Sequence, residues 1–512
     1  MVEAVNAIEL KNITKRFGKV VANDSVNLVL RKGEILSILG ENGSGKTTLM
    51  NMLSGIYFPE EGQIFVNGRE VVIASPKDAF DLGIGMIHQH FKLVDVLTAA
   101  ENIILGLPGK MNLKMDDVVK DIQELVSRYG FELDCRKKIY EMSVSEKQTV
   151  EIVKMLYRGS DILILDEPTA VLTPQETDKL FAVLRNMKAD GRSIIIITHK
   201  LHEVLALSDR VSVLRKGKYI GTVNTCDATE SSLTEMMVGQ KVSLNIDRPE
   251  PENTRKVLEV SGISCMDKEG VKTLDDVSFT AYGGEILGVA GIAGSGQKEL
   301  LESIVNLEPI VSGSISCVNA NGENVPISSM TADQILDKGI QIAFVPEDRL
   351  GMGLVGSMDM TDNMMLRSYK DGGHIFADRK KPRALAESII EKLSIVTPGV
   401  STPVGRLSGG NVQKVLVGRE ISLNPDVLLV AYPVRGLDIN SSYTIYNLIN
   451  EQKKKGVAVI CVIEDLDVLL ELADRIMVLC GGRVTGIVDG RTATKEQIGL
   501  LMTKGQKEES HV

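Results

Sequence analysis

Residues 35–48 read ILSILGENGSGKTT, which is an apolar strand, a glycine-rich loop and the first residues of a helix. The glycines let backbone N–H groups turn inward around a phosphate chain, and the following helix directs its positive end toward it. Lys46 supplies a charge for the β- and γ-phosphates, and the Thr47 hydroxyl is placed to ligate Mg²⁺. We therefore expect a nucleoside triphosphate to bind at Gly40, Glu41, Asn42, Gly43, Ser44, Gly45, Lys46, Thr47 and Thr48.

An altered copy of this loop occurs at residues 291–298, which read GIAGSGQK. Counted from Lys46 to Gln297, the copy lies 251 positions downstream, and Lys298 stands where the hydroxyl residue should be. The halves also match elsewhere, because Ser143 aligns with Ser408 at an offset that has grown to 265 positions. Such growth indicates insertions in loops of the second half. The sequence thus predicts two related nucleotide-binding units, of which only the first is equipped for chemistry.

Each half alternates short apolar strands with helical patterns, which is typical of an α/β domain with a mostly parallel sheet. We expect a first domain at 1–243, a linker at 244–255 and a second domain at 256–512. The linker contains the polar, charged and proline-bearing run DRPEPEN. Within the first domain, a 3.6-residue period from about 95 to 142 predicts an inserted helical subdomain.

Composition restricts the classes of function. The 512 residues suffice for several domains, and they carry a formal net charge of −10. An acidic balance argues against nonspecific nucleic-acid binding, which needs a basic face. The six cysteines are scattered without metal-type spacing and fit a reducing compartment. The apolar runs have strand length and the start lacks a secretory pattern, so we expect membrane association to come through a partner.

Further candidate residues follow short apolar strands. The strand at residues 162–165 runs into Asp166 and Glu167. Downstream of a phosphate loop, Asp166 is expected to hold Mg²⁺ and Glu167 to polarise the attacking water, rather than to solvate a strand end. His199 follows another strand, where a γ-phosphate sensor is needed, although a lone histidine is more often structural. Gln89 is placed to ligate Mg²⁺ and the water.

Phe17 lies shortly before the loop and is placed to stack on a nucleobase. Such a contact is worth about 1–3 kcal/mol by analogy with other base–aromatic pairs. The alternative interpretation is a buried phenylalanine of the core.

Residues 407–413 read LSGGNVQ, which resembles the signature sequence of ATP-binding cassette (ABC) ATPases. Loop, glutamine, signature, acidic strand and histidine occur in the family's order over nearly the whole chain. The resemblance implies an α/β fold of two tandem P-loop ABC nucleotide-binding domains, each with a mostly parallel core sheet, an antiparallel β part and a helical subdomain. The tandem arrangement is similar to that of ATPase subunits of bacterial importers for simple sugars and nucleosides. Residues 88–94 (HQHFKLV) and 166–176 (DEPTAVLTPQE) are most similar to the nucleoside branch.

In this family two cassettes pack head to tail, so that each ATP lies between the loop of one and the signature of the other. The resemblance implies that the first loop is completed by Ser408, Gly409, Gly410 and Asp438. The opposite site would combine the altered positions Lys268, Gln297, Glu347, Ala431, Tyr432 and Glu464 with Ser143, Val144, Ser145, Glu146 and Thr173. This sorting of the alterations by composite site supports the arrangement, and nucleotide binding at the altered site stays open.

The resemblance implies an enzyme that hydrolyses ATP, with ATP and Mg²⁺ as cofactors, to energise uptake of a nucleoside. Its implied partners are two integral membrane permease subunits and, indirectly, an extracytoplasmic solute-binding protein, at the cytoplasmic face of the membrane. A ribose- or galactose-type sugar is the alternative solute, because solute and subunit copy number depend on other chains. The acidic balance and single intact site disfavour a soluble regulatory ATPase acting on ribosomes or nucleic acid. Glu167 and His199 disfavour a non-catalytic scaffold.

Overall fold

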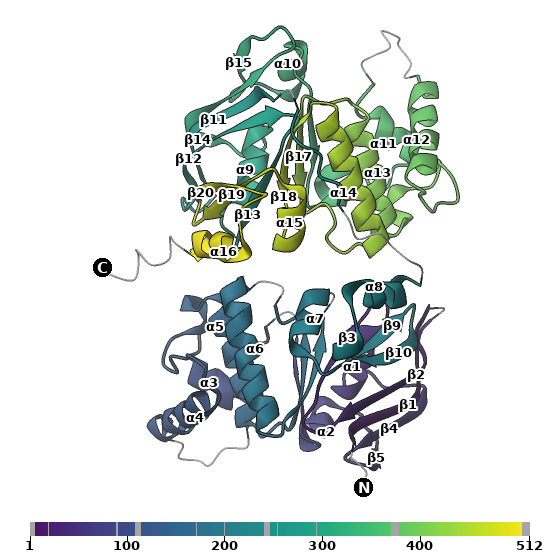
Figure 1. Cartoon of the computed structure of the whole chain (residues 1–512), viewed down its shortest axis with the longest axis vertical. Coiled ribbons are helices and arrows are strands. Elements are labelled where there is room, and N and C mark those ends of the chain that lie inside the picture. Colours follow the sequence, from purple (N-terminus) through teal and green to yellow (C-terminus); the bar gives the residue numbers. More distant parts are fainter. Residues whose placement is uncertain are drawn as a thin grey trace. The chain divides into compact units, whose positions relative to one another are not determined.

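The computed structural model describes residues 6–18, 20–88, 91–107, 114–169, 172–198, 200–239, 246–252, 254–292, 294–369 and 378–503. The chain forms two compact units, Met1–Ser243 and Leu244–Val512 (Figure 1). Each unit has its own pair of sheets and its own hydrophobic core. The predicted α/β fold of two tandem units is therefore confirmed. Among the described residues, no helix combines the length and apolar character that crossing a bilayer requires.

The first unit is built on a six-stranded sheet with the order β10-β9-β3-β8-β7-β6. Its strands are β3 (Ile35–Leu39), β6 (Ile84–Ile87), β7 (Ile162–Asp166), β8 (Ser193–Ile197), β9 (Arg210–Arg215) and β10 (Lys218–Asn224). The neighbouring strands from β6 to β9 pair in parallel, and β10 is antiparallel to β9. All residues of β3, β7 and β8 are buried, as expected for a parallel sheet that is covered on both faces.

The second sheet of this unit is antiparallel and has the order β2-β1-β4-β5. Its strands are β1 (Asn6–Phe17), β2 (Val20–Arg31), β4 (Glu61–Val66) and β5 (Arg69–Val71). Helix α1 (Lys46–Leu53) packs against both sheets, because Leu49 shares one hydrophobic cluster with Ile8 of β1 and Ile164 of β7. The next residue of β7, Leu165, belongs to a separate cluster with Leu184 on the other face. This alternation follows from the two-residue period of a strand.

The remaining helical segments of the first unit are α2 (Pro76–Asp81), α3 (Ala99–Ile104), α4 (Met115–Tyr129), η1 (Ile139–Glu141), α5 (Val144–Tyr157), α6 (Pro174–Ala189), α7 (Leu201–Leu207), η2 (Thr225–Asp227) and α8 (Glu230–Val238). Helices α3, α4 and α5 share a small core of their own, in which Ile103, Ile122 and Val150 take part. Leu184 of α6 packs with Leu156 of α5 and Leu165 of β7 instead. Helix α5 therefore joins the small helical cluster to the large sheet.

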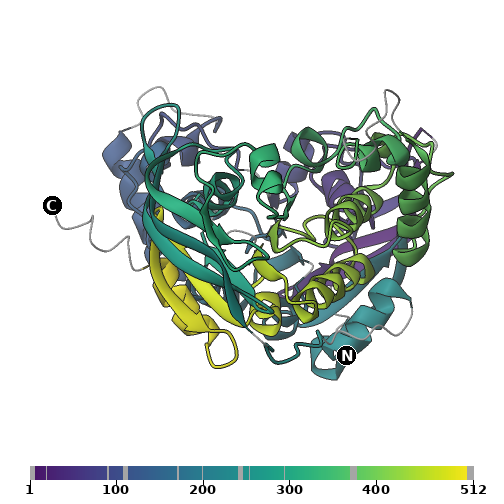
Figure 2. The ribbon, with the colours of Figure 1, turned by 90° about the horizontal axis from the view of Figure 1, so that it is seen from above.

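The second unit repeats this plan with a six-stranded sheet in the order β16-β17-β18-β13-β19-β20 and an antiparallel sheet in the order β12-β11-β14-β15. The strands are β11 (Arg255–Met266), β12 (Lys272–Gly283), β13 (Ile286–Gly291), β14 (Ile310–Val318), β15 (Asn324–Pro326), β16 (Ile342–Val345), β17 (Val427–Ala431), β18 (Ala458–Val462), β19 (Arg475–Cys480) and β20 (Arg483–Asp489). Seen from above, the green helices and the yellow C-terminal strands of this unit lie on separate sides of it (Figure 2).

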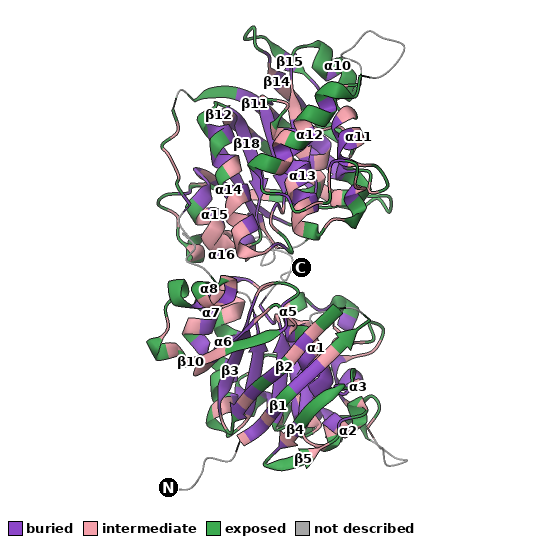
Figure 3. Cartoon of the chain, turned by 90° about the vertical axis from the view of Figure 1, so that its right-hand side faces the viewer, coloured by how far each residue is buried: buried purple, intermediate pink, exposed green. Residues whose placement is uncertain are grey.

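The helical segments of the second unit are α9 (Gln297–Ile304), α10 (Ala332–Asp337), η3 (Arg349–Gly353), α11 (Met360–Met365), α12 (Lys380–Lys392), η4 (Val404–Arg406), α13 (Gly409–Ile421), α14 (Ile439–Lys454), α15 (Leu466–Leu472) and α16 (Lys495–Thr503). In both units the central strands of the large sheet are buried, whereas the edge strands β10 and β20 and the outer faces of the helices are largely exposed (Figure 3). Because both faces of the sheet are covered, polar side chains can reach a ligand only at the ends of the strands.

An ion pair with a buried carboxylate and a partly buried arginine occurs at the same place in each unit. In the first unit, the Arg210 guanidinium donates to the Glu34 carboxylate at 2.9 Å. In the second, Arg475 donates to Glu285 at 2.8 Å. Each pair joins the start of the strand that precedes the glycine-rich loop to the neighbouring strand, β9 or β19. The scaffold that carries the loop is thus duplicated along with the loop itself.

Part of the predicted linker 244–255 belongs to the second unit. Ile246 is buried in its core. The Arg248 guanidinium donates to the carbonyls of Leu470 at 2.8 Å and Ala473 at 2.7 Å. These contacts fix residues 246–248 on α15 and on the turn that follows it.

Candidate active site

The loop between β3 and α1 has a backbone that requires glycine. Gly43 and Gly45 have φ angles of 78° and 96°, in the left-handed region that favours glycine. A Cβ on Gly40 would overlap the carbonyl oxygen of Leu214, and one on Gly45 would overlap that of Ala22. Gly45 also begins α1 without a side-chain cap, so the N–H groups of the first turn are left for another acceptor.

Lys46 lies at the centre of this loop with only 6% of its surface exposed. Its ammonium donates to the carbonyls of Gly40 at 2.6 Å and Glu41 at 3.0 Å. Burial lowers the pKa of Lys46, while the carboxylates of Glu167 and Asp166 act in the opposite direction. The ammonium is therefore held over the loop in a place where additional negative charge would stabilise it.

Two carboxylates end strand β7 next to the loop. Burial and the charge of Glu167 raise the pKa of Asp166 to about 6, against the effects of a Thr47 hydrogen bond and of Lys46. The backbone of Glu167 has a φ of 49°, and its N–H donates to the carbonyl of Ile197 at 2.8 Å. A non-glycine residue held in this region costs about 1–3 kcal/mol and is typical of functional sites.

These groups fit a triphosphate with Mg²⁺. The Ser44 hydroxyl is buried and has no hydrogen-bond partner within the described part of the chain. Burial, and after it the charge of Glu167, raises the pKa of Asp166, and a cation bound to its carboxylate would oppose both effects. Hydroxyl and carboxylate oxygens are the ligands that Mg²⁺ prefers. Thr47 and Asp166 would hold the metal, and Lys46 with the loop N–H groups would hold the phosphates.

The fold brings Lys46, Thr47, Asp166 and Glu167 together, whereas Gln89 and His199 lie outside the described residues. A buried residue that sequence reasoning missed supports this edge of the sheet. The Glu203 carboxylate of α7 accepts hydrogen bonds from the Thr169 hydroxyl at 2.6 Å and the Thr198 hydroxyl at 3.4 Å.

Lys200 completes this support, because its ammonium lies 3.2 Å from the other oxygen of Glu203 and 3.1 Å from the carbonyl of Thr169. Glu203 therefore connects the segment after β7, at Thr169, with the segment after β8, at Thr198 and Lys200. A glutamate on the buried face of a short helix was the signal that could have identified it.

Phe17 ends β1 with 43% of its surface exposed, so the alternative interpretation as a core residue is wrong. Its ring packs edge to face on Tyr57, with 5.2 Å between the ring centroids. Tyr57 follows α1 and was not predicted from the sequence as part of the site. The Lys15 ammonium lies over the same ring, 5.4 Å from its centroid, so a base that stacks on Phe17 would share the ring with these two neighbours.

The signature helix α13 and its counterpart α5 begin differently. Ser143 caps α5 by accepting the N–H of Glu146 at 3.2 Å, and the Glu146 carboxylate accepts the N–H of Ser143 at 2.7 Å. Ser408 begins α13 without any such cap, and its hydroxyl oxygen accepts from the Asn411 amide at 3.0 Å. The start of α5 is thus closed by its own side chains, whereas the start of α13 leaves its N–H groups and the Ser408 proton available.

Asp438 lies next to this signature. A Cβ on Gly410 would lie 3.7 Å from a carboxylate oxygen of Asp438, which places the two residues side by side. Asp438 itself caps α14, accepting the N–H of Ser441 at 2.8 Å and its hydroxyl at 2.7 Å. The second unit therefore presents Ser408, Gly409, Gly410 and Asp438 as one group.

The altered loop of the second unit keeps the geometry of the first but loses its charge. Gln297 is buried, and its side-chain amide donates to the carbonyl of Ile292 at 3.1 Å, which corresponds to the Lys46 contact with Glu41. Gly296 has a φ of 99° and begins α9 as Gly45 begins α1. The amide satisfies the loop carbonyl without attracting phosphate.

Tyr432 copies the backbone of Glu167 without its carboxylate. Its φ is 47°, and its N–H donates to the carbonyl of Val462 at 3.0 Å. Burial, with the charges of Glu464 and Glu347, raises the pKa of Tyr432 to about 12. The phenol stays protonated at neutral pH and cannot serve as a base for water.

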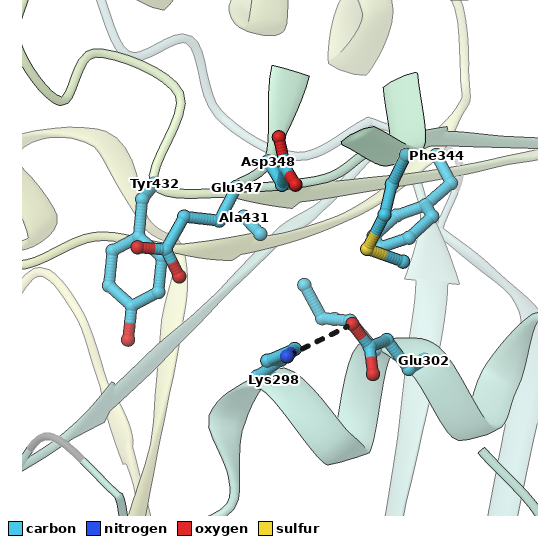
Figure 4. A pocket seen from close by; sticks show the side chains of 9 residues that line it. Lys298, Glu302, Phe344, Glu347, Asp348, Ala431 and Tyr432 are labelled. Carbon is cyan, nitrogen blue, oxygen red and sulfur yellow. Dashed lines mark ion pairs between the residues drawn. The ribbon is translucent and has the colours of Figure 1, made fainter. Parts of the chain in front are cut away.

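A cavity of about 310 Å³ lies beside the altered loop (Figure 4). It is lined by Lys298, Leu301, Glu302, Phe344, Glu347, Asp348, Met352, Ala431 and Tyr432. The Lys298 ammonium forms an ion pair with Glu302 at 3.8 Å, as the dashed line in Figure 4 marks. Two further carboxylates remain in the lining, and Ala431 offers no metal ligand. The charges around this cavity oppose a bound triphosphate.

Comparison with known proteins agrees with this geometry. The family model described as ABC transporter matches residues 23–170 and 274–433. The nucleoside import ATP-binding protein NupA of Lactococcus lactis is 42% identical over 97% of this chain and 98% of the relative. The glucose import ATP-binding protein TsgD13 of Haloferax volcanii is 40% identical over 97% of this chain and 96% of the relative. The guanosine import ATP-binding protein NupO of Bacillus subtilis is 41% identical over 98% of both chains.

Proposed function

Since this chain belongs to the ABC transporter family, we propose that it hydrolyses ATP at one composite site to energise solute uptake through partner permeases. The observation that carries the proposal is the contrast between the two loops. The first unit places Lys46 and Thr47 beside Asp166 and Glu167, and the second unit has neutral side chains at the positions of Lys46, Asp166 and Glu167.

In the proposed reaction, Lys46 and the loop N–H groups hold the β- and γ-phosphates, and Phe17 stacks on the base. Mg²⁺, when bound by Thr47, Asp166 and Gln89, neutralises charge on the phosphates. The Glu167 carboxylate orients the attacking water and takes its proton. His199 donates to the γ-phosphate. The support around Glu203 keeps the ends of β7 and β8 in place for these steps.

We propose that the signature of the second unit completes this site. The Ser408 hydroxyl and the N–H groups of the first turn of α13 would donate to the γ-phosphate, and Asp438 would border it. The uncapped start of α13 supports this role, since its donors are not used within the helix. In α5 the capping box at Ser143 instead occupies the N–H of Glu146 in the first turn.

The proposed partners are two integral membrane permease subunits, which contact surfaces near Gln89 and Glu347. The chain would then lie at the cytoplasmic face of the membrane, and an extracytoplasmic solute-binding protein would deliver the solute. Two of the relatives named above are described as importers of nucleosides, which favours a nucleoside as the solute. A simple sugar is the second candidate, because the third of those relatives is described as a glucose importer.

The test is reconstitution of the full chain with the permeases encoded beside it and with their solute-binding protein, in liposomes. We expect Mg²⁺-dependent phosphate release together with uptake of radiolabelled nucleoside, and an excess of unlabelled ribose should leave that uptake unchanged. Ribose or glucose uptake without nucleoside uptake would select the sugar alternative. Hydrolysis without association with any permease would overturn the importer assignment.

A further inference from the structure

Arg349 joins two segments of the second unit that the proposed function uses. It begins η3, directly after the Glu347–Asp348 pair. Its guanidinium donates through Nη1 to the carbonyl of Gly409 at 3.4 Å and through Nη2 to the carbonyl of Arg435. Gly409 belongs to the signature, and Arg435 lies in the turn that leads to Asp438. One planar side chain therefore spans both elements.

The Arg435 side chain fixes the same turn from the other direction. Its guanidinium forms an ion pair with Glu347, and its Nε lies 3.6 Å from a carboxylate oxygen of Glu464. Glu347 follows β16 and Glu464 follows β18, at the positions that align with Gln89 and His199. Glu347 and Glu464 thus both hold the turn that contains Arg435, although each of these exposed ion pairs contributes little stability by itself.

The first unit carries no arginine at the aligned positions, which are occupied by Phe91 and Ala170. The start of its helix α5 is fixed locally instead, by the capping box of Ser143 and Glu146. The signature with two glycines has no capping box: the Asn411 amide donates to the Ser408 hydroxyl, but the two glycines leave the backbone of the first turn free. Arg349 supplies a restraint on that backbone from outside the helix, through the carbonyl of Gly409.

We propose that Arg349 is a positioning residue for ATP hydrolysis. By bridging the carbonyls of Gly409 and Arg435, it sets the separation between the signature and the turn carrying Asp438, and so directs the Ser408 hydroxyl. The inference rests on the proposed function, since Ser408 and Asp438 serve the reaction only there. If so, the altered segment around Glu347 contributes to ATP hydrolysis at the intact loop of the other unit.

The first experiment compares Arg349→Gln and Arg349→Lys with the control Arg383→Gln in the full chain reconstituted with its permeases. Arg383 is exposed on α12 and pairs with Glu387 on the same helix. We expect Arg349→Gln to lower kcat about 10- to 100-fold, because small misplacements of reacting groups have effects of that order. Arg349→Lys should be intermediate, since an ammonium cannot span two carbonyls as a guanidinium does. If Arg349→Gln fails to fold, the kcat of Arg349→Lys tests the proposal in its place.

Affinity for ADP separates positioning from general damage. ADP lacks the γ-phosphate that the signature contacts, so both Arg349 variants should bind ADP at the first loop within about twofold of the unaltered protein. The midpoint of thermal unfolding should match that of Arg383→Gln. An unchanged kcat in Arg349→Gln, or losses of ADP affinity and thermal stability in parallel with kcat in both variants, would overturn the proposal.

A double-mutant cycle with Ser408→Ala tests whether Arg349 acts through the signature. If it does, the double variant should be about as slow as Ser408→Ala alone, because the group that Arg349 positions is already missing. Reductions in kcat that multiply would show an independent effect and contradict the inference. Normal turnover of Ser408→Ala would instead place the failure in the proposed composite site.

Discussion

The two glycine-rich loops share a backbone and differ in their charges. Glu167 and Tyr432 both occupy the left-handed region, with φ of 49° and 47°, and both donate to the adjacent strand. Lys46 and Gln297 both reach a loop carbonyl. The fold dictates these features, because the strand order and glycine geometry are the same in each unit. The two loops thus differ in a few side chains without any change of scaffold, and we propose that these side chains remove catalytic capacity from the second.

The signature helices show the opposite distribution. The unit with the complete loop begins α5 with a closed capping box, and the unit with the altered loop begins α13 with uncapped glycines. In the proposed composite site, each unit therefore supplies one half of the required groups. The contrast leads us to expect a role in stability for Ser143 and a role in hydrolysis for Ser408, and substitutions can separate these two roles.

The largest effect is expected at Glu167. Glu167→Gln keeps the size of the side chain but removes the group that takes the proton from water, so turnover should fall about 10²- to 10⁴-fold. Tyr432→Phe at the corresponding position should leave turnover unchanged, since the phenol has no role in hydrolysis. Steady-state phosphate release measures both variants. Near-normal turnover by Glu167→Gln would contradict the proposed catalytic difference between Glu167 and Tyr432.

The next contrast concerns the two signature serines. Ser408→Ala should lower turnover about 10²-fold, as expected for loss of a donor to developing charge, with little change in the unfolding midpoint. Ser143→Ala should instead lower the free energy of unfolding by about 1 kcal/mol through loss of its cap, with turnover preserved. Phosphate release and thermal unfolding measured on both variants decide the matter. The reverse pattern would show that the signatures have been assigned to the wrong roles.

Local patterns predicted the fold and the centre of the site, because those features depend on near neighbours in sequence. The run ILSILGENGSGKTT contains the strand, loop and helix start that hold Lys46, and an apolar strand places Asp166. The Glu203 support and the Arg349 bridge were not predictable in the same way. Arg349 contacts Gly409 across 60 positions of sequence, and only packing in space brings the two together.

A smaller effect concerns the stability of the nucleotide-free chain. The pKa of Asp166 in the folded protein is about 6, above its ordinary value near 3.8, so the folded state binds this proton more tightly than the unfolded state. The free energy of unfolding therefore falls as pH rises from about 4 to about 6, as the buried carboxyl ionises. Asp166→Asn removes this penalty. It should raise the free energy of unfolding by about 1–3 kcal/mol at pH 8 and by less at pH 5.

Thermal unfolding without nucleotide or metal at these two pH values measures the effect. The matched control is Ala431→Asp, which places a carboxylate at the corresponding strand end of the second unit. It should destabilise more at pH 8 than at pH 5. An equal gain for Asp166→Asn at both pH values would mean that burial and Glu167 do not raise the pKa of this carboxyl as described.

The smallest effect is expected from repairing the altered loop with Gln297→Lys and Lys298→Thr. The new ammonium would take the place of the amide that now donates to Ile292, so ATP should be retained more tightly. Loss of Lys298 would also leave Glu302 without its ion-pair partner beside the cavity, which adds negative charge where phosphate would lie.

Turnover per chain should nevertheless stay within about twofold of the unaltered protein, because charge at the loop is only one of the requirements for hydrolysis. Ala431 gives Mg²⁺ no ligand, and Tyr432, with a pKa of about 12, gives the water no base. Adding Lys46→Ala to the repaired chain silences the first loop, so any remaining phosphate release reports on the second. A doubling of phosphate release in the repaired chain that persists after Lys46→Ala would contradict this expectation. It would show that the loop lysine alone accounts for the difference in hydrolysis between the two units, and that the carboxylates at the strand end matter less than their geometry indicates.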